Sequence, residues 1–255
     1  DEFDIISGHN CSVGIGIPGF SSKDTEIVTN ANSLWLNNKP FKKDLEIALN
    51  RKVKLMNDAN CFTLSEALDG AGKEFKSIFG IIIGTGFGGG LSYKKEIIEG
   101  ANQIAGDWGH QPLPYPTNEE IKTKIKCPSS NCGRPLCAEQ FMSGVGFSNI
   151  FNIKHNTSFN AEEISKLDNK DDKRADDEFN LYEDRMARLM AVMIGIFDPD
   201  AIILGGGMSN IDRFYVNIPT LIPKYTFSNK VKTKVLKNFH GDSSGVRGAA
   251  WLWNN

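Results

Sequence analysis

Residues 78–90 read IFGIIIGTGFGGG, an apolar run joined directly to a glycine-rich run. The apolar part, Ile78 to Ile83, predicts a buried strand, because it is short and bounded by glycine. A second strand of this kind is predicted at Ala201 to Leu204 and leads into Gly205-Gly206-Gly207. Glycine lets the backbone N–H groups after a strand approach an anion closely. Two such strand ends indicate a site for an anionic ligand.

Further predicted strands alternate with predicted helices along the chain. The strands are Val13 to Ile17, Val53 to Met56, and Leu91 to Ile98, the last as the return strand of a hairpin around Lys94-Lys95. The helices are Lys43 to Leu49, Cys61 to Gly70, Leu181 to Phe197, and Ser243 to Trp253 with Ser243 or Ser244 as N-cap. The third helix grows more apolar toward its end, so we expect that end to be buried. This alternation predicts an α/β fold with largely parallel sheets.

The composition is that of an ordinary globular protein. The chain has 255 residues, of which 40% are hydrophobic and 24% charged, and its net charge is −2. We therefore expect no attraction to nucleic acid or anionic lipid, no membrane span, and a cytoplasmic location. The charged segment from Ala161 to Phe179 is typical of a solvated helical surface. The chain opens at Asp1 and soon enters a strand, which leads us to expect a fragment of a longer protein.

The glycine run Gly84 to Gly90 has two interpretations. It lacks the Lys-Ser/Thr ending of a Walker P-loop. It could still hold phosphate oxygens, with Thr85 adding a hydroxyl donor, or it could be a tight hairpin turn with no ligand. The second glycine run, Gly205 to Gly207, is equally ambiguous alone, but the pair in one α/β chain favours a nucleotide cleft.

The segment Asn57-Asp58-Ala59-Asn60 follows a predicted strand, at the end where open α/β sheets bind ligands. A carboxylate at Asp58 could accept the proton of an attacking hydroxyl group. The same residues also suit an Asx-turn that caps the next helix. The spacing does not decide between these two roles.

A group of metal-binding residue types lies in the middle of the chain. His110 precedes Cys127, Cys132 and Cys137, which are spaced Cys-x4-Cys-x4-Cys. Three thiolates and an imidazole match a closed, structural zinc site, although the spacing is looser than in a zinc finger. The alternative is a set of loop cysteines without a metal. The other cysteines, Cys11 and Cys61, are better interpreted as small buried hydrophobic residues.

Several segments together resemble the ROK family of sugar kinases. They are NDANCFTLSEA, IIIGTGFGGG, AGDWGHQPLP, CGRPLCAEQFMSG, DPDAIILGGGMSN and GDSSGVRGAAWLW. Within the family, the resemblance is closest to bacterial manno(fructo)kinases and next to N-acetylglucosamine kinases. It implies the actin-like ATPase (ribonuclease H-like) fold, with two domains around a cleft. The domains would be residues 1–77 with 245–255, a small N-terminally incomplete domain, and residues 78–244, a large domain with the zinc loop.

The resemblance also implies roles for individual residues. Asp58 corresponds to the general base that deprotonates the sugar 6-hydroxyl. The sugar would be bound by Asn32, Asn57, Asp107, His110 and Glu139. The nucleotide would be bound by Gly84, Thr85, Gly86, Gly205, Gly206 and Gly207. The implied cofactors are ATP, Mg²⁺ and a structural Zn²⁺ on His110, Cys127, Cys132 and Cys137, which would shape the sugar pocket.

The sequence departs from the family pattern at three places. The family's opening Asp-x-Gly-Gly-Thr-Lys phosphate loop has no counterpart in these residues, so we expect the chain as given to be nearly inactive. Asp107 stands where the family usually has Glu, which puts that sugar contact in doubt. Cys127 and Cys132 replace a Cys-x-Cys pair, so Cys127 is the weakest metal assignment.

The function implied is ATP-dependent phosphorylation of a hexose, fructose first, at its 6-hydroxyl. One alternative is an N-acetylhexosamine kinase. Another is a ROK transcriptional regulator, whose DNA-binding part would lie upstream of Asp1. A third is a zinc-stabilised remnant without activity. Family analogy further implies a homodimer with a small-molecule sugar and ATP as partners.

Overall fold

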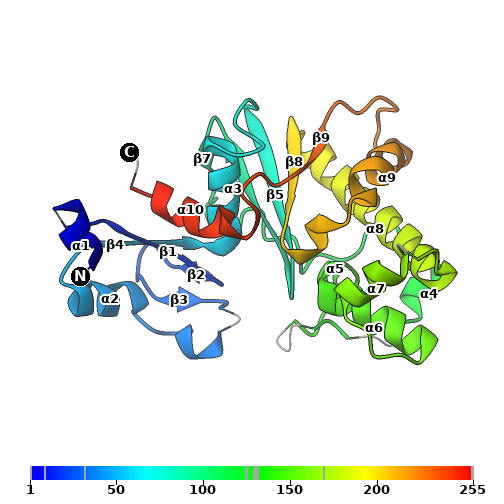
Figure 1. Ribbon diagram of the computed structural model, residues 1–255, viewed down its shortest axis with the longest axis horizontal. Coiled ribbons are helices and arrows are strands. Elements are labelled where there is room, and N and C mark those ends of the chain that lie inside the picture. Colours follow the sequence, from blue (N-terminus) through cyan, green and yellow to red (C-terminus); the bar gives the residue numbers. More distant parts are fainter. Residues whose placement is uncertain are drawn as a thin grey trace.

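The chain forms two α/β lobes placed side by side (Figure 1). The computed structural model describes residues 2–8, 10–31, 33–123, 126–128, 132–168 and 170–253, and all side chains in these ranges except those of residues 2 and 3. Strands β1 to β4 with α1 and α2 make up the small lobe, and the segments from β5 to β9 make up the large lobe. Helices α3 and α10 lie at the junction. We keep the division into residues 1–77 with 245–255 and residues 78–244 as a proposal.

The large lobe is built on a five-stranded sheet in the order β7-β6-β5-β8-β9. Strands β5, β8 and β9 run parallel, and β6 and β7 continue from β5 as antiparallel hairpins. Their bounds are β5 Ser77–Ile83, β6 Phe87–Tyr93, β7 Glu96–Ile97, β8 Ala201–Gly205 and β9 Lys234–Lys237. The β6–β7 turn at Lys94-Lys95 confirms the predicted hairpin. Strand β5 is central and almost entirely buried, as its unbroken apolar sequence predicts.

The glycine run after β5 is only partly a turn. Gly88, Gly89 and Gly90 belong to strand β6, and the turn itself is confined to residues 84–86. A Cβ atom on Gly90 would lie 2.6 Å from the Asn60 side-chain oxygen, because α3 crosses the sheet at that point. Part of the glycine run thus serves close helix–sheet packing, which corrects the expectation of one long turn.

Helices cover the large lobe on the side away from α3 (Figure 1). They are α4 Asn118–Ile121, α5 Ala138–Met142, α6 Gly144–His155, α7 Ala161–Asp168, α8 Lys173–Phe197 and α9 Arg213–Leu221, with the 3-10 turns η2 Gly207–Asn210 and η3 Ile222–Lys224. The buried residues of α8 end at Ala191, whereas Val192 and Ile196 are 39% and 78% exposed. The prediction that the apolar end of this helix is buried holds for residues 189–191. It is wrong for the last turn, where Gly195 and Ile196 are exposed because no neighbouring element covers them among the described residues.

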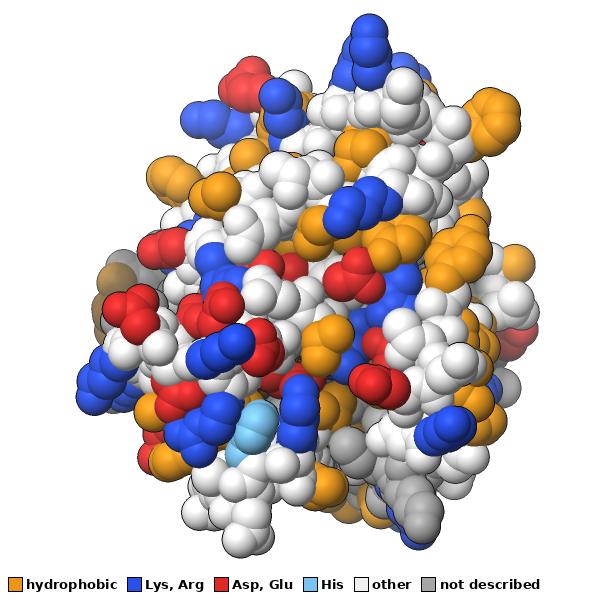
Figure 2. Space-filling view, turned by 90° about the vertical axis from the view of Figure 1, so that its right-hand side faces the viewer, with side chains coloured by type: hydrophobic (Ala, Val, Ile, Leu, Met, Phe, Trp, Pro, Cys, Tyr) orange, Lys and Arg blue, Asp and Glu red, His pale blue; other side chains and the backbone are white. Residues whose placement is uncertain are grey.

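The surface of the large lobe mixes both charge signs. Figure 2 shows Asp and Glu side chains interspersed with Lys and Arg, with hydrophobic side chains between them. In the charged segment 161–179, Glu162 and Glu163 are exposed, but Ile164, Ala175 and Phe179 are fully buried. The segment is thus a solvated surface on its outer side and part of the core on its inner side. Among the described residues, no helix is long and apolar enough to span a bilayer.

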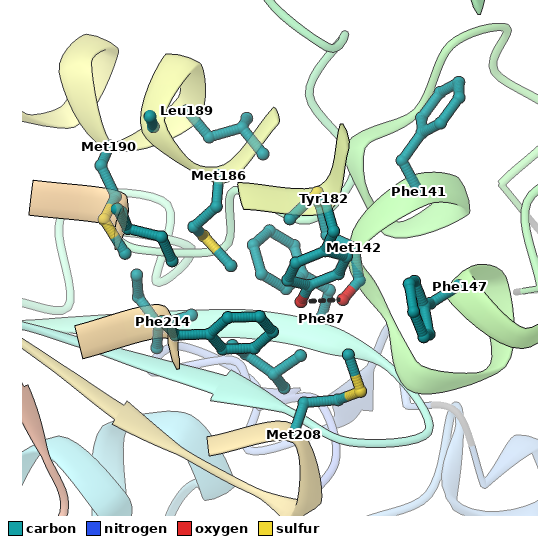
Figure 3. Close-up of a cluster of buried hydrophobic side chains, with 14 of the residues drawn as sticks. Phe87, Phe141, Met142, Phe147, Tyr182, Met186, Leu189, Met190, Met208 and Phe214 are labelled. Carbon is teal, nitrogen blue, oxygen red and sulfur yellow. Dashed lines mark hydrogen bonds between the residues drawn. The ribbon is translucent and has the colours of Figure 1, made fainter. Parts of the chain in front are cut away.

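The core of the large lobe lies between its sheet and α8 (Figure 3). Phe147, Tyr182 and Phe214 are fully buried, and the Tyr182 and Phe214 rings stack with their centroids 5.0 Å apart. The Tyr182 hydroxyl donates to the carbonyl oxygen of Met142 at 2.8 Å. A buried phenol with a satisfied hydroxyl fixes α8 against α5, the helix that carries Glu139.

The small lobe has two short sheets. Strands β1 Val13–Ile17 and β4 Val53–Asn57 pair in parallel, and β2 Phe20–Ser21 and β3 Val28–Thr29 pair antiparallel. The other elements of this lobe are α1 Glu2–Ser7, α2 Phe41–Leu49 and η1 Leu34–Leu36. The helices at the junction are α3 Asp58–Leu68 and α10 Ser244–Trp251, the latter preceded by η4 Gly241–Ser243. The lobe has its own small core of Ile17, Val28, Ala31 and Leu36.

Helix α10 packs closely on α3. A Cβ atom on Gly248 would lie 1.7 Å from the carbonyl oxygen of Cys61, so only glycine fits there. The Ser244 hydroxyl donates to the buried Glu66 carboxylate at 2.8 Å, and Ser243, which occupies the N-cap position, makes no side-chain cap bond. Both predicted N-cap serines thus fail as caps, because tertiary contacts fix the start of this helix.

Candidate functional site

The two strands that lead into glycine turns, β5 and β8, end close together. Strands β5 and β8 are parallel neighbours, so their carboxyl ends lie at the same edge of the sheet. The turn at Gly84 is held by a hydrogen bond from the Gly144 N–H to the Gly84 carbonyl oxygen, at 2.8 Å. Gly206 makes the second turn with a φ of 80°, a left-handed conformation that favours glycine. The predicted convergence of the glycine turns is therefore present.

Asp58 lies where β4 passes into α3. Helix α3 begins at Asp58 itself, three residues earlier than the predicted Cys61, and Asn57 is its N-cap. The Asn57 side-chain oxygen accepts from the N–H groups of Ala59 and Asn60, at 3.0 and 3.3 Å. Its amide group donates to the Gly19 carbonyl oxygen at 3.2 Å. The capping role thus belongs to Asn57, which leaves one oxygen of Asp58 available to a ligand.

The carboxyl group of Asp58 is unusually basic for an aspartate. Burial raises its pKa, the N–H of Ala59 on Oδ1 at 2.8 Å lowers it in part, and the charge of Asp107 raises it further. Burial also raises the pKa of Asp107. A carboxylate that is buried and near a second acid accepts a proton more readily than one in water, as a general base requires.

Asp58 faces a cavity of about 330 Å³ between the two lobes. Its walls include most of the predicted sugar-binding residues: Asn57, Asp107, His110 and Glu139, together with the turn Gly84-Thr85-Gly86. Asn32 lies outside the described residues. The sequence analysis missed Pro18, Gly19, Phe20 and Asn30, which also line this cavity. Pro18-Gly19 directly follows the predicted strand Val13 to Ile17, and nothing in the local sequence marks it as part of a site.

A larger cavity of about 860 Å³ adjoins the first and is also bounded by Gly84 and Thr85. Its other walls come from Ile83, from η2 with Ile211, from α6, and from residues 158–165 at the start of α7. Gly205 and Gly206 do not line it. A Cβ atom on Gly205 would instead lie 2.4 Å from the ring of Phe62, and Gly206 shapes the turn. Of the second predicted glycine run, Gly207 alone lines this cavity.

Glu139 reaches the smaller cavity from the first turn of α5. It is 6% exposed, and its Oε2 accepts from the Phe87 N–H at 3.2 Å. Its own N–H donates to the Gly109 carbonyl oxygen at 2.8 Å, which fixes α5 beside His110. Helix α5 and the adjacent turn at residues 109–110 therefore place an acid and an imidazole on the same wall.

The four predicted metal ligands converge. His110, Cys127, Cys132 and Cys137 present ligand atoms that all lie within 4.8 Å of one another. Cys137 Sγ is 3.5 Å from Cys127 Sγ and 3.4 Å from His110 Nδ1. Zinc–sulfur bonds of about 2.3 Å in a tetrahedron place sulfur atoms about 3.8 Å apart, so this donor set fits Zn²⁺. Cys127, the weakest sequence assignment, lies with the other three.

The site thus pairs a buried carboxylate in a small polar cavity with a larger cavity bounded by backbone turns. This geometry gives the chain two adjoining cavities with a glycine turn between them. The sequence model described as the ROK family matches residues 5–255. The chain belongs to the ROK family.

Two similar proteins are both named N-acetyl-D-glucosamine kinase. The one from Vibrio cholerae is 37% identical over 251 residues, covering 98% of this chain and 83% of the relative. The one from Vibrio atlanticus is 38% identical over 240 residues, covering 94% and 80%.

Solved structures of the family share the fold. A ROK family glucokinase from Streptomyces griseus, in complex with glucose and AMPPNP, gives a TM-score of 0.81 at 24% identity, covering 96% of this chain and 82% of that one. A ROK hexokinase from Thermus thermophilus gives a TM-score of 0.80 at 22% identity, covering 97% of this chain and 80% of that one. A ROK family transcriptional regulator, a homolog of the E. coli MLC protein, gives a TM-score of 0.80 at 19% identity, covering 98% of this chain and 65% of that one. The predicted actin-like ATPase fold is confirmed.

Proposed function

We propose that this protein transfers the γ-phosphoryl group of ATP to the primary 6-hydroxyl of a hexose. The observation that carries the proposal is the wall shared by the two cavities. Gly84 and Thr85 bound both the cavity that contains Asp58 and the larger cavity beside it. A sugar in the first and a nucleotide in the second would meet at this turn, where a hydroxyl could attack a terminal phosphate.

Asp58 supplies the base for this transfer. Its free oxygen would accept the proton of the sugar hydroxyl as the new oxygen–phosphorus bond forms and the bond to ADP breaks. Backbone N–H groups of the Gly84–Gly86 turn and the Thr85 hydroxyl would bind the phosphate oxygens, whose negative charge they match. Mg²⁺ is expected to accompany ATP and to offset part of the phosphate charge.

The sugar proposed first is N-acetyl-D-glucosamine. The sequence motifs favour fructose, but both curated relatives described above, at 37% and 38% identity, are named N-acetyl-D-glucosamine kinases. Fructose therefore remains the second candidate. A panel of these two sugars with glucose and mannose, measured as kcat/KM, ranks the candidates.

Zinc, in this proposal, holds the sugar-side wall in place. The four ligands would bind Zn²⁺ as a closed site, which leaves no position for activating water. His110 lines the sugar cavity and belongs to the metal group, so the ion would fix one side chain of the sugar site.

Replacing Asp58 with Asn tests the proposal, in the protein with the family's opening phosphate loop included. We expect turnover to fall about 10²–10⁴-fold, because the amide cannot accept the proton. Sugar binding, measured by calorimetry, should change much less. Stability at neutral pH should hold or rise: the raised pKa means that ionised Asp58 destabilises the fold above that pKa, and Asn removes this cost.

Asp177→Asn is the matched control, since Asp177 is an exposed aspartate on α8 outside both cavities. It should turn over normally. Near-normal turnover by Asp58→Asn would remove Asp58 from the base role. Tight sugar binding with no turnover in the unmodified protein would instead favour a sugar-responsive regulator.

A further inference from the structure

A third cavity, of about 630 Å³, opens from the far side of the proposed sugar site. It shares Asn30, Asp107 and His110 with the cavity that contains Asp58. It shares none of its described lining residues with the proposed nucleotide cavity. The three cavities therefore follow one another in a row, with the proposed sugar site in the middle.

This order sets which end of a bound sugar would face the third cavity. The hydroxyl to be phosphorylated must lie at Asp58 and the Gly84-Thr85 turn, next to the nucleotide cavity. The opposite end of the ring then lies at Asp107 and His110, where the wall opens. A substituent at that end would extend into the third cavity without displacing the ring.

The lining of the third cavity suits a polar occupant. Asn38, Gln111 and Thr29 supply amide and hydroxyl groups, and the exposed Arg134 supplies a guanidinium group. Arg134 Nη1 donates to the His110 carbonyl oxygen at 3.3 Å, which leaves its other donors available. The apolar members are Ala31 and Ile104. Hydrogen-bonding groups in such excess match the hydroxyls of a sugar better than an alkyl or acyl chain.

We infer that the third cavity binds a second sugar ring, so that the protein phosphorylates the terminal hexose of a disaccharide as well as a free hexose. This inference rests on the proposed kinase function and adds a substrate class to it. The terminal hexose occupies the cavity of Asp58, and the glycosidic bond passes between Asp107 and His110. The transferred phosphoryl group and the accepted proton are unchanged, because the reacting hydroxyl is the same.

The experiment compares N-acetyl-D-glucosamine with its β-1,4-linked disaccharide as substrates of the protein with the family's opening phosphate loop included. The variant Ile104→Trp fills the third cavity; Ile104 is 47% exposed and lies outside the catalytic cavity, so the fold should tolerate the larger side chain. Ile153→Trp is the matched control, on the surface of α6 at 70% exposure. Thermal unfolding of each variant verifies the fold.

We expect the unmodified protein to phosphorylate both sugars, with the phosphate on the terminal ring by mass spectrometry. Ile104→Trp should lower kcat/KM for the disaccharide about tenfold or more and leave that for the monosaccharide within about twofold, because it fills space that only the second ring needs. Ile153→Trp should change neither. Phosphorylation of the monosaccharide alone overturns this inference and spares the kinase proposal. Phosphorylation of neither sugar overturns both, and equal loss of both in Ile104→Trp overturns the assignment of the cavity.

Discussion

Replacing Glu120 with Gln should destabilise the large lobe, because this buried carboxylate links α4 to α8 through hydrogen bonds with two arginines. Glu120 is 5% exposed. Its oxygens accept from Arg185 Nε at 2.8 Å and from Arg188 Nη1 and Nη2 at 3.0 and 2.8 Å. They also accept from the Thr117 N–H at 2.9 Å. Arg188 further donates to the carbonyl oxygens of residues 114 and 115, so the same guanidinium holds the loop backbone.

The magnitude follows from removing the anion that two buried cations share. Each cation keeps one other acidic partner, Glu178 for Arg185 and Asp184 for Arg188, both at 3.1 Å. Removing one partner of a buried, hydrogen-bonded ion pair costs about 3–5 kcal/mol. Gln preserves the shape, but its NH₂ group faces guanidinium donors and cannot accept from them. At a urea m-value of about 3 kcal/mol/M, the unfolding midpoint should fall by about 1–2 M.

The effect should depend on pH in a set direction. Burial acts to raise the pKa of Glu120, but hydrogen bonds from Arg188 and Arg185 outweigh it and lower the pKa to about 2. The stabilisation is therefore complete above the unfolded pKa, about 4.3, and is lost as pH falls toward 2. The difference in unfolding midpoint between Glu120→Gln and the unmodified protein should be largest at pH 7 and should shrink progressively below pH 4.

The assay is urea unfolding followed by circular dichroism at several pH values. Glu119→Gln, an exposed neighbour on the same helix, is the control and should keep the midpoint of the unmodified protein. Equal midpoints for Glu120→Gln and the unmodified protein at pH 7 would refute the reasoning. A difference in midpoint that grows as the pH is lowered would refute it as well.

Two more predictions concern the site. Asp107→Asn should move the acid limb of the kcat/KM profile to lower pH, because the charge of Asp107 raises the pKa of Asp58; a limb that stays in place would show that Asp58 does not govern it. Cys137→Ser should lose stoichiometric zinc in metal analysis and weaken sugar binding about 10–100-fold, since Cys137 is a member of the metal group beside His110. Zinc-free unmodified protein that binds sugar normally would contradict this.

The sequence was informative wherever the signal is local. The apolar run 78–83 ended by glycine predicted β5. The polar residues after Val53–Met56 indicated either a site or a helix cap at the end of β4, and Asn57 is the cap of α3. Thiol and imidazole groups at residues 110–137 predicted a shared metal site, and their ligand atoms do converge. Each of these depends on residue type and short spacing, which the chain carries in linear order.

The structure decided what depends on distant segments. The exposed end of α8 and the buried Glu120–Arg188 pair reflect which elements cover them, and no local pattern reports that. Gly90 looked like a turn residue, because a close helix crossing and a turn select the same residue type.

By itself the sequence determined which residue types follow the strands, namely glycine turns and an aspartate, and it supplied a group of one histidine and three cysteines of the types that hold metals. Only the tertiary structure decided that three cavities lie in a row and which residues bound two of them at once. A cavity is bounded by side chains from segments far apart in the chain. Its position follows from how the lobes pack, which no single stretch of residues encodes.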